Sequence, residues 1–336
     1  MSKKLTVAVA LHPELMPDLS VNNIKKNNRL SFPWITEWDV AKSLERLGHR
    51  IIFYPIKEQG CIKNLLKEST GFDLVFNLLE EVGSDPKKDF LLPKILNEHE
   101  IPFTGCNSEE LIFGRDKILA KNKVLKYIKS PKTIDLSRPS FPLILKFNNE
   151  DGSYGIFKKN ICNNIKELSS RKSFLKKRYK GELYAEEFIE GIESYVSIFQ
   201  RPNGSIKVFN PRVLDFPLSR NPEKEIYSQM AKWSDRFQSN KKIKTMTLDD
   251  QSLALSLKKR AIEIYIGLGL EGPMRIDFRS NDFGVYFLEI NPNPNLAVDD
   301  DFYLSMASEG ISYDEMVESL IEIGLKRHKL RNHLAA

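Results

Sequence analysis

The chain has 336 residues, of which 41% are apolar and 29% are charged, and its formal net charge at neutral pH is +6. This is an ordinary globular composition, and the length predicts a large core divided into two or three lobes. No run of about 18 apolar residues is present, and the first residues lead into a short strand, so we expect a cytoplasmic protein without a membrane partner. Three distant cysteines predict neither a disulfide framework nor a metal site.

The first hundred or so residues alternate between predicted strands and helices. Apolar periodicity predicts strands at 5–11, 50–56, 72–78 and 101–104. It predicts helices at 37–47 and near 89–100. This alternation is typical of a doubly wound parallel sheet in the α/β class. The glycine fingerprint of dinucleotide-binding sheets is absent after the first strand, so NAD binding is not expected.

Helices are expected again in the middle and at the end of the chain. Asn107 and Glu110 predict a capping box for a helix that continues towards Tyr127. Two more amphipathic helices are expected at 253–268 and 312–325. The long, charged stretch at 217–250 has little apolar periodicity, which predicts a mobile loop or lid rather than a core element.

A polar loop at 148–156 separates two apolar runs and contains Gly152 and Gly155. Such a loop can lay backbone N–H groups around phosphates, although a plain hairpin turn would use the same residues. Strands are expected on either side and further along, at 141–147, 183–191 and 194–199.

Residues 273–296 carry the most informative pattern. Two strands of period-two alternation flank a short turn, so Arg275 and Asp277 share one face of the first strand. Glu289 and Asn291 share a face of the second strand, and pairing across the turn brings the four side chains together. Two carboxylates and an amide oxygen suit Mg²⁺, and an arginine beside them suits a phosphoryl group. A solvated, exposed hairpin face is the alternative interpretation.

In chain order these features are a helix with a lysine, a strand that ends in a lysine, a glycine loop, an acidic segment between strands and the charged hairpin. From about residue 72 to 325, this order resembles the ATP-grasp superfamily, and within it the D-alanine–D-alanine ligases. The matching motifs begin at Ile101, Arg115, Leu143, Gly152, Glu186, Arg275 and Glu289. The resemblance implies an α/β, three-lobed ATP-grasp fold: a Rossmann-like pre-ATP-grasp domain at 1–107, a central lobe at 108–190, and a C-terminal lobe with the metal site and mobile loop at 191–330.

The resemblance also implies roles for individual residues. The expected ATP contacts are Lys117, Lys146, Ser153, Glu186, Glu187, Ile189 and Glu193. The expected ligands of Mg²⁺ are Asp277, Glu289 and Asn291, which would serve two ions, with Mn²⁺ as the alternative metal. Lys232, on the mobile loop over the phosphates, and Arg275, beside the developing oxyanion, are the expected catalytic residues.

The implied reaction is the ATP-dependent, ADP-forming joining of a carboxylate to an amine through an acyl phosphate. We expect amino acids or short peptides as substrates, but not D-alanine with D-alanine. Asn295 stands where these ligases carry a glycine, and three aspartates at 299–301 occupy the region of a following serine. Such carboxylates would repel a substrate carboxylate and favour an amine, whereas a solvated acidic loop is the alternative. The expected substrate residues are Glu14, Asn77, Glu80, Asp300 and Asp301.

Other functions stay open at this point. A related ligase could add residues to a peptide or protein tail, in the manner of glutamate-adding or glutathione-forming enzymes. An ATP-binding regulatory module without turnover is disfavoured by the intact charged hairpin. A nucleic-acid partner is not expected, because basic residues lack interleaved exposed aromatic residues. The sequence does not fix the oligomeric state, and a homodimer is one option because related ligases are often dimers.

Overall fold

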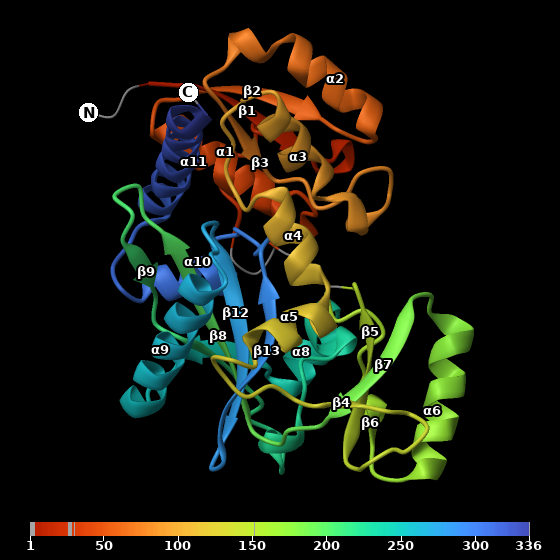
Figure 1. Ribbon diagram of the computed structural model, residues 1–336. Coiled ribbons are helices and arrows are strands. Elements are labelled where there is room, and N and C mark those ends of the chain that lie inside the picture. Colours follow the sequence, from red (N-terminus) through yellow and green to blue (C-terminus); the bar gives the residue numbers. More distant parts are fainter. Residues whose placement is uncertain (1–3, 26–28, 30, 151, 336) are drawn as a thin grey trace.

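The computed structural model describes residues 4–25, 29, 31–150 and 152–335 of the chain. The strands in these residues form three sheets in three parts of the molecule (Figure 1). A three-stranded sheet lies at the top of the view, a six-stranded sheet at the lower left and a four-stranded sheet at the lower right. Among the described residues, no helix combines the length and apolar character that crossing a bilayer needs.

The three-stranded sheet is wholly parallel and has the order β2–β1–β3. Its strands are β1 (Thr6–Leu11), β2 (Arg50–Pro55) and β3 (Leu74–Asn77). Its helices are α1 (Ile35–Arg46), α2 (Gln59–Lys67), α3 (Leu91–Glu98) and, from the other end of the chain, α11 (Tyr313–Ala335).

Helices cover both faces of this sheet. Val7 and Val9 belong to the core formed with α1 and α11, whereas Ala8 and Ala10 pack in the core formed with α2 and α3. The predicted doubly wound parallel sheet is therefore confirmed. Helix α2 was not predicted, because only Ile62 and Leu65 of its nine residues are buried.

The four-stranded sheet is antiparallel and has the order β4–β7–β5–β6. Its strands are β4 (Thr133–Ile134), β5 (Leu143–Asn148), β6 (Ile161–Cys162) and β7 (Glu182–Glu187). Helix α6 (Ile165–Arg178) covers one face, where Leu168 and Leu175 join the core of the sheet. This helix was also missed, because these two leucines are its only buried residues and its apolar stripe is thin.

The six-stranded sheet has the order β11–β10–β8–β12–β13, and β9 pairs with β8. Its strands are β8 (Ile192–Gln200), β9 (Ile206–Val208), β10 (Arg212–Asp215), β11 (Lys244–Thr247), β12 (Met274–Asn281) and β13 (Gly284–Asn291). Met274, Ile276 and Phe278 are fully buried in one core with helix α9 (Gln251–Gly267). The predicted alternation of the hairpin is thus confirmed, and its charged face is left on the opposite side.

The helix predicted from Asn107 towards Tyr127 is wrong as a single element. Its capping box is present, but the chain breaks into α4 (Ser108–Arg115) and α5 (Lys117–Val124) at Asp116, whose ψ is 89°. The Asp116 carboxylate accepts a hydrogen bond from the Leu119 N–H and so begins a new helix. The break places Lys117 in the first turn of α5, next to β13.

The stretch at 217–250 is more ordered than predicted. It contains α7 (Gln229–Trp233), α8 (Asp235–Lys241) and β11, which pairs with β10 and so extends the six-stranded sheet. The prediction that this stretch is a mobile loop or lid rather than a core element is wrong for β11, and the elements were missed because they are too short to show a period. Helix α10 (Asp301–Ala307) was likewise not predicted from its acidic start.

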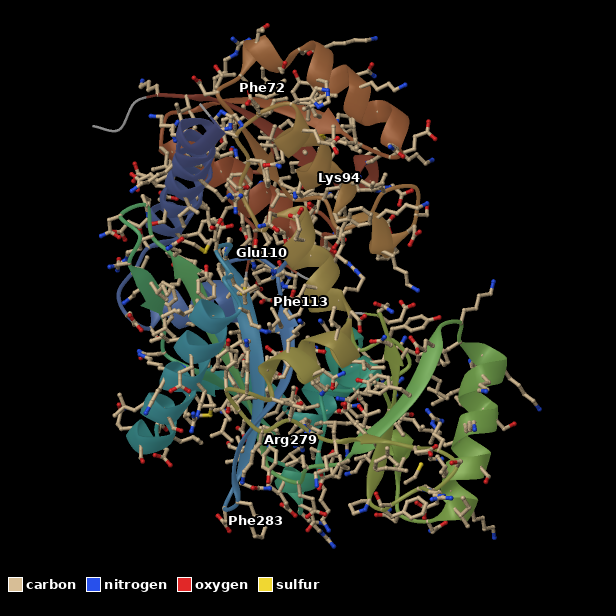
Figure 2. All side chains as sticks on the ribbon, viewed as in Figure 1. Phe72, Lys94, Glu110, Phe113, Arg279 and Phe283 are labelled. Carbon is tan, nitrogen blue, oxygen red and sulfur yellow. The ribbon has the colours of Figure 1, made fainter. Side chains whose placement is uncertain are left out.

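Glu110 links the upper and lower parts of the molecule (Figure 2). Its carboxylate caps α4 through the Asn107 N–H and also accepts hydrogen bonds from the N–H groups of Glu271 and Gly272, just before β12. One buried side chain thereby sets the position of α4 against the charged hairpin.

Candidate active site

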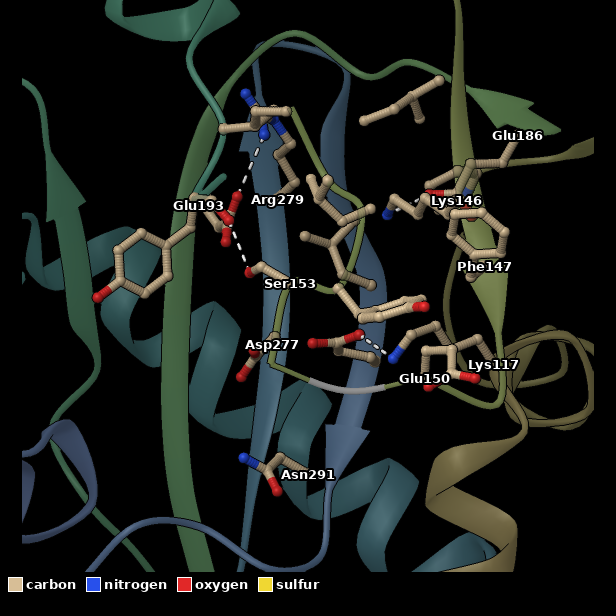
Figure 3. A pocket seen from close by; sticks show the side chains of 18 of the residues that line it. Lys117, Lys146, Phe147, Glu150, Ser153, Glu186, Glu193, Asp277, Arg279 and Asn291 are labelled. Carbon is tan, nitrogen blue, oxygen red and sulfur yellow. Dashed lines mark hydrogen bonds and ion pairs between the residues drawn. The ribbon is translucent and has the colours of Figure 1, made fainter. Parts of the chain in front are cut away.

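A cleft with about 1060 Å³ of empty space, open solvent included, is lined by residues of the four-stranded and six-stranded sheets (Figure 3). All of the residues predicted to contact ATP, bind metal or act in catalysis line it: Lys117, Lys146, Ser153, Glu186, Glu187, Ile189, Glu193, Lys232, Arg275, Asp277, Glu289 and Asn291. These residues span most of the chain between α5 and the end of β13, so the fold collects them at one place.

The hairpin forms one wall of the cleft. Arg275 is the register partner of Asn291, and Asp277 is the register partner of Glu289. A β-bulge follows Asp277, and it lets Phe287 pack in the core while Glu289, two residues on, lines the cleft. The predicted juxtaposition of the four polar side chains is therefore present.

Arg275 and Asp277 form a buried bidentate ion pair, with Nε–Oδ1 and Nη2–Oδ2 distances of 2.8 and 2.9 Å. The Arg275 guanidinium also lies 4.6 Å from the ring centre of Tyr195. Burial raises the pKa of Asp277 to about 6 against the opposing effect of Arg275. The ion pair fixes the guanidinium in a plane that faces the cleft.

Glu289 pairs with Lys117 across the cleft, at 2.7 Å between Oε2 and Nζ (Figure 3). Burial by itself would raise the pKa of Glu289, but Lys117, Lys146 and Arg275 lower it to about 2. The carboxylate is therefore ionised at any physiological pH and available as a hard oxygen ligand.

The donor set fits a magnesium ion that is shared with phosphates. Among the described residues, no group of three or more His, Cys, Asp and Glu side chains gathers to hold a metal ion by itself. Asp277, Glu289 and Asn291 supply two carboxylates and one amide oxygen on adjacent strands of the cleft wall. Mg²⁺ is commonly bound in this way, through one or two carboxylates completed by water and phosphate oxygens.

Glu186 lies at the opposite wall, on β7, and is almost fully buried. Its two carboxylate oxygens pair with two lysines, Lys146 at 2.6 Å and Lys121 at 2.9 Å. Burial would raise the pKa of Glu186, but the two lysines outweigh it and lower the pKa. The Tyr184 hydroxyl also donates to this carboxylate, at 3.2 Å. An ionised acceptor is thus held at the edge of the cleft.

Glu193 follows the segment that connects β7 to β8. Its carboxylate accepts a hydrogen bond from Arg279 at 3.3 Å (Figure 3) and another from the Tyr195 hydroxyl at 3.0 Å. Arg279 also donates to the carbonyl oxygen of Glu223 and lies over the Phe188 ring. These contacts orient Glu193 at the side of the cleft.

The glycine loop contacts the segment that carries Lys232. The Ser153 hydroxyl donates to the Tyr227 carbonyl oxygen at 2.8 Å, and the Gly155 N–H donates to the Gln229 side chain at 3.2 Å. Gly155 has a φ of +66°, and a Cβ there would lie 2.8 Å from the Phe147 ring. Lys232, one turn beyond on α7, is thereby placed in the lining of the cleft.

The residues expected to read the substrate lie outside this lining. Glu14 is exposed in a short 3₁₀ helix, and Asn77 stabilises the turn after β3 by accepting from the Leu79 N–H. Glu80 is exposed, and the charge of Lys232 acts on it. Asp301 pairs with Arg212 at 3.2 Å. The remaining residue of the set, Asp300, lies just before α10.

Sequence reasoning assigned no role to two charged residues of the site region. Arg279 follows Arg275 and Asp277 at period two, so the strand pattern contained the signal. Lys121 follows Lys117 by one helical turn, which placed both on one face of α5.

Comparisons with known proteins identify the family of the chain. A family model described as D-ala D-ala ligase C-terminus matches residues 118–322, well over half of the chain. The chain belongs to the D-alanine–D-alanine ligase family. It is accordingly an ATP-dependent, ADP-forming enzyme that joins a carboxylate to an amine, and the predicted family resemblance is confirmed.

Individual relatives extend this finding over nearly the whole chain. The D-alanine–D-alanine ligase of Pseudothermotoga lettingae is 26% identical over 86% of this chain and 93% of its own length. That of Pelagibacter ubique is 28% identical over 84% and 90%.

Solved structures show the same ATP-grasp fold. The D-alanine–D-alanine ligase of Bacillus anthracis complexed with ATP has a TM-score of 0.71 at 17% identity, and 97% of this chain and 99% of that chain are covered. The VanG D-Ala:D-Ser ligase of Enterococcus faecalis has a TM-score of 0.69 at 18% identity, with 96% and 99% covered.

Proposed function

We propose that the cleft binds ATP and activates a small carboxylate substrate as an acyl phosphate, which an amine then converts to an amide. The observation that carries this proposal is the convergence of all twelve predicted ATP, metal and catalytic residues on one cleft.

The nucleotide would lie between the two sheets. Glu186 would accept from the adenine amino group, with the backbone of Glu187 and Ile189 beside it, and Glu193 would accept from the ribose hydroxyls. The phosphates would then extend towards the hairpin. There they would meet a set of donors from four elements: Lys117, Lys146, Ser153 and Lys232.

Asp277, Glu289 and Asn291 would hold Mg²⁺, with two ions in the site and Mn²⁺ as the alternative metal. A metal there would supply charge neutralisation on the phosphoryl group. Arg275 is held by Asp277 and faces the same space, where it would stabilise the oxyanion of the tetrahedral intermediate. A single such donor contributes roughly 3–4 kcal/mol in other enzymes.

We further propose amino acids or short peptides as substrates, in a pair other than D-alanine with D-alanine. The relatives above are named for D-alanine, and the support for a different pair is the run of three aspartates at 299–301.

We also propose the three-part division at 1–107, 108–190 and 191–330, which is supported by a separate sheet in each part. Helix α11 leaves the third part and packs on the first sheet. The free cysteines fit the expected cytoplasmic location.

The test is a trap for the acyl phosphate. Purified protein is incubated with ATP, Mg²⁺ and hydroxylamine together with single amino acids, dipeptides or small acids, and ADP and hydroxamate are measured. We expect ADP and hydroxamate to form together with at least one donor. Glu289→Gln should abolish both because it removes a metal ligand, whereas Asp282→Asn, exposed at the turn of the same hairpin, should not. Full turnover in Glu289→Gln would refute the metal assignment.

A further inference from the structure

The three neighbouring aspartates at 299–301 have different environments. Asp299 pairs with Arg29 at 3.0 Å, and Asp301 pairs with Arg212 at 3.2 Å. Asp300, between them, has no ion pair among the described residues, and its Oδ1 atom is buried without a hydrogen-bond partner. The flanking aspartates are therefore used within the fold, whereas the middle one is not.

Helix capping does not account for Asp300. It stands at the N-cap of α10, but its side chain makes no full capping hydrogen bond, and the Phe302 N–H in the first turn only partly offsets the rise in the pKa of this carboxylate. The backbone around it is fixed instead by other contacts, since the Val298 N–H donates to Asp39 and the Asp300 N–H donates to the Ala297 carbonyl oxygen. Asp300 is thus held in place by its neighbours, and its Oδ1 atom is left without a hydrogen-bond partner among the described residues.

Asp300 lies outside the lining of the cleft, but it is close enough for the charges of lining residues to act on it. The charges of Arg275 and Lys232, both of which line the cleft, act on it. Asp300 in turn acts on Tyr227, another residue of the lining. Burial and the neighbouring Asp301 raise the pKa of Asp300 to about 6, so the group is mainly ionised at neutral pH and above.

A buried carboxylate oxygen without a donor is costly, and a bound N–H group would offset that cost. A substrate carboxylate would meet like charge at this position, whereas an ammonium group would meet an ionised acceptor that is already in place. The site therefore selects for positive charge on the part of a substrate that reaches α10.

On the basis of the proposed function, we propose that Asp300 binds a second, cationic amino group of the acceptor, so that the carboxylate donor is the amino acid or short peptide and the acceptor amine is a small diamine rather than an α-amino acid. One amine attacks the acyl phosphate, forms the amide bond and releases phosphate and a proton, and the other amine pairs with Asp300. The charge of the second group, rather than its size, distinguishes this acceptor from alanine.

The experiment separates activation of the donor from choice of the acceptor. A donor is first found by hydroxamate formation, because hydroxylamine carries no second cationic group for Asp300 to bind. With that donor, three acceptors of similar size are compared: alanine in both enantiomers, alaninamide and 1,2-diaminopropane. We expect kcat/KM for the diamine to exceed that for alanine by at least roughly tenfold, with alaninamide between them.

Asp300→Asn keeps the shape of the side chain and removes its charge. We expect it to lower the ratio of diamine to alanine kcat/KM by roughly tenfold, and the rate with hydroxylamine shows how much activation the variant retains. Asp282→Asn is the control and should keep the wild-type ratio. Because each ratio compares two acceptors on one protein, partial loss of folded protein does not change it.

The outcomes distinguish the two proposals. Hydroxamate formation together with a wild-type preference for alanine, or an unchanged ratio in Asp300→Asn, would refute the role of Asp300 and leave the ligase proposal standing. No hydroxamate with any donor would refute the proposed function, and the inference about the acceptor with it.

Discussion

The paired lysines on Glu186 provide the sharpest test of how the cleft is built. Lys121 does not line the cleft, and it is 3% exposed on α5 with its Nζ atom 2.9 Å from Glu186. We expect Lys121 to be a positioning residue. It would keep Glu186 ionised when Lys146 turns from this carboxylate to the phosphates of bound ATP.

Lys121→Met removes that second cation at nearly constant volume. Breaking a buried ion pair costs roughly 3–5 kcal/mol of unfolding free energy. Glu186 keeps Lys146 at 2.6 Å and the Tyr184 hydroxyl at 3.2 Å, so we expect the lower end, about 3 kcal/mol. The KM for ATP should also rise, by at least roughly tenfold, because Glu186 and the phosphates then compete for one lysine.

The assay combines urea unfolding with ATP kinetics on the same preparations. Lys123→Met is the matched control, because Lys123 is exposed on the same helix and should change neither quantity. We expect a smaller change in kcat than in KM, since Lys121 contacts Glu186 and not the reacting groups. If both variants lost less than about 1 kcal/mol of unfolding free energy and had the same KM for ATP, the positioning role of Lys121 would be refuted.

Two further predictions concern stability. Burial, with Glu80 and Asp39 nearby, raises the pKa of Glu37 from its ordinary 4.5 to about 8. The contribution of this group to the unfolding free energy is therefore fully present below pH 4.5 and is lost towards pH 8, by up to about 1.4 kcal/mol per pH unit. Glu37→Gln should flatten this fall in the unfolding free energy, as measured by urea titrations at several pH values. Parallel pH profiles of the unfolding free energy in the wild type and in Glu37→Gln would contradict this prediction. Gly191→Ala should cost at least about 2 kcal/mol, because its Cβ would lie 2.2 Å from the Ser280 carbonyl oxygen, whereas Gly204→Ala meets no atom and should cost less.

The sequence predicted the lining of the cleft well because the responsible signals are local. Period two in β12 and β13 placed Arg275 and Asp277 opposite Glu289 and Asn291, and the short turn left little freedom in their register. The alternation of strands and helices before residue 107 likewise predicted the parallel sheet. Motif order then supplied the remaining lining residues through the family resemblance.

Elements with weak or short periods could not be predicted in this way. Helix α6 buries only two leucines, and β11 has four residues that are stabilised by pairing with β10. The break at Asp116 was also unpredictable, because a continuous helix and two capped helices satisfy the same local pattern. Yet this break turns Lys117 towards Glu289.

The sequence by itself determined which residue types are present and how they alternate along each strand and helix. Only the tertiary structure decided which charges are paired, since partners such as Arg29 and Asp299 are 270 positions apart. Asp299, Asp300 and Asp301 are of the same residue type. In the fold, Asp299 and Asp301 each pair with an arginine, whereas Asp300 has a buried oxygen without a hydrogen-bond partner among the described residues. Periodicity is a property of neighbours in the chain, whereas the environment of a charge depends on every element that packs around it.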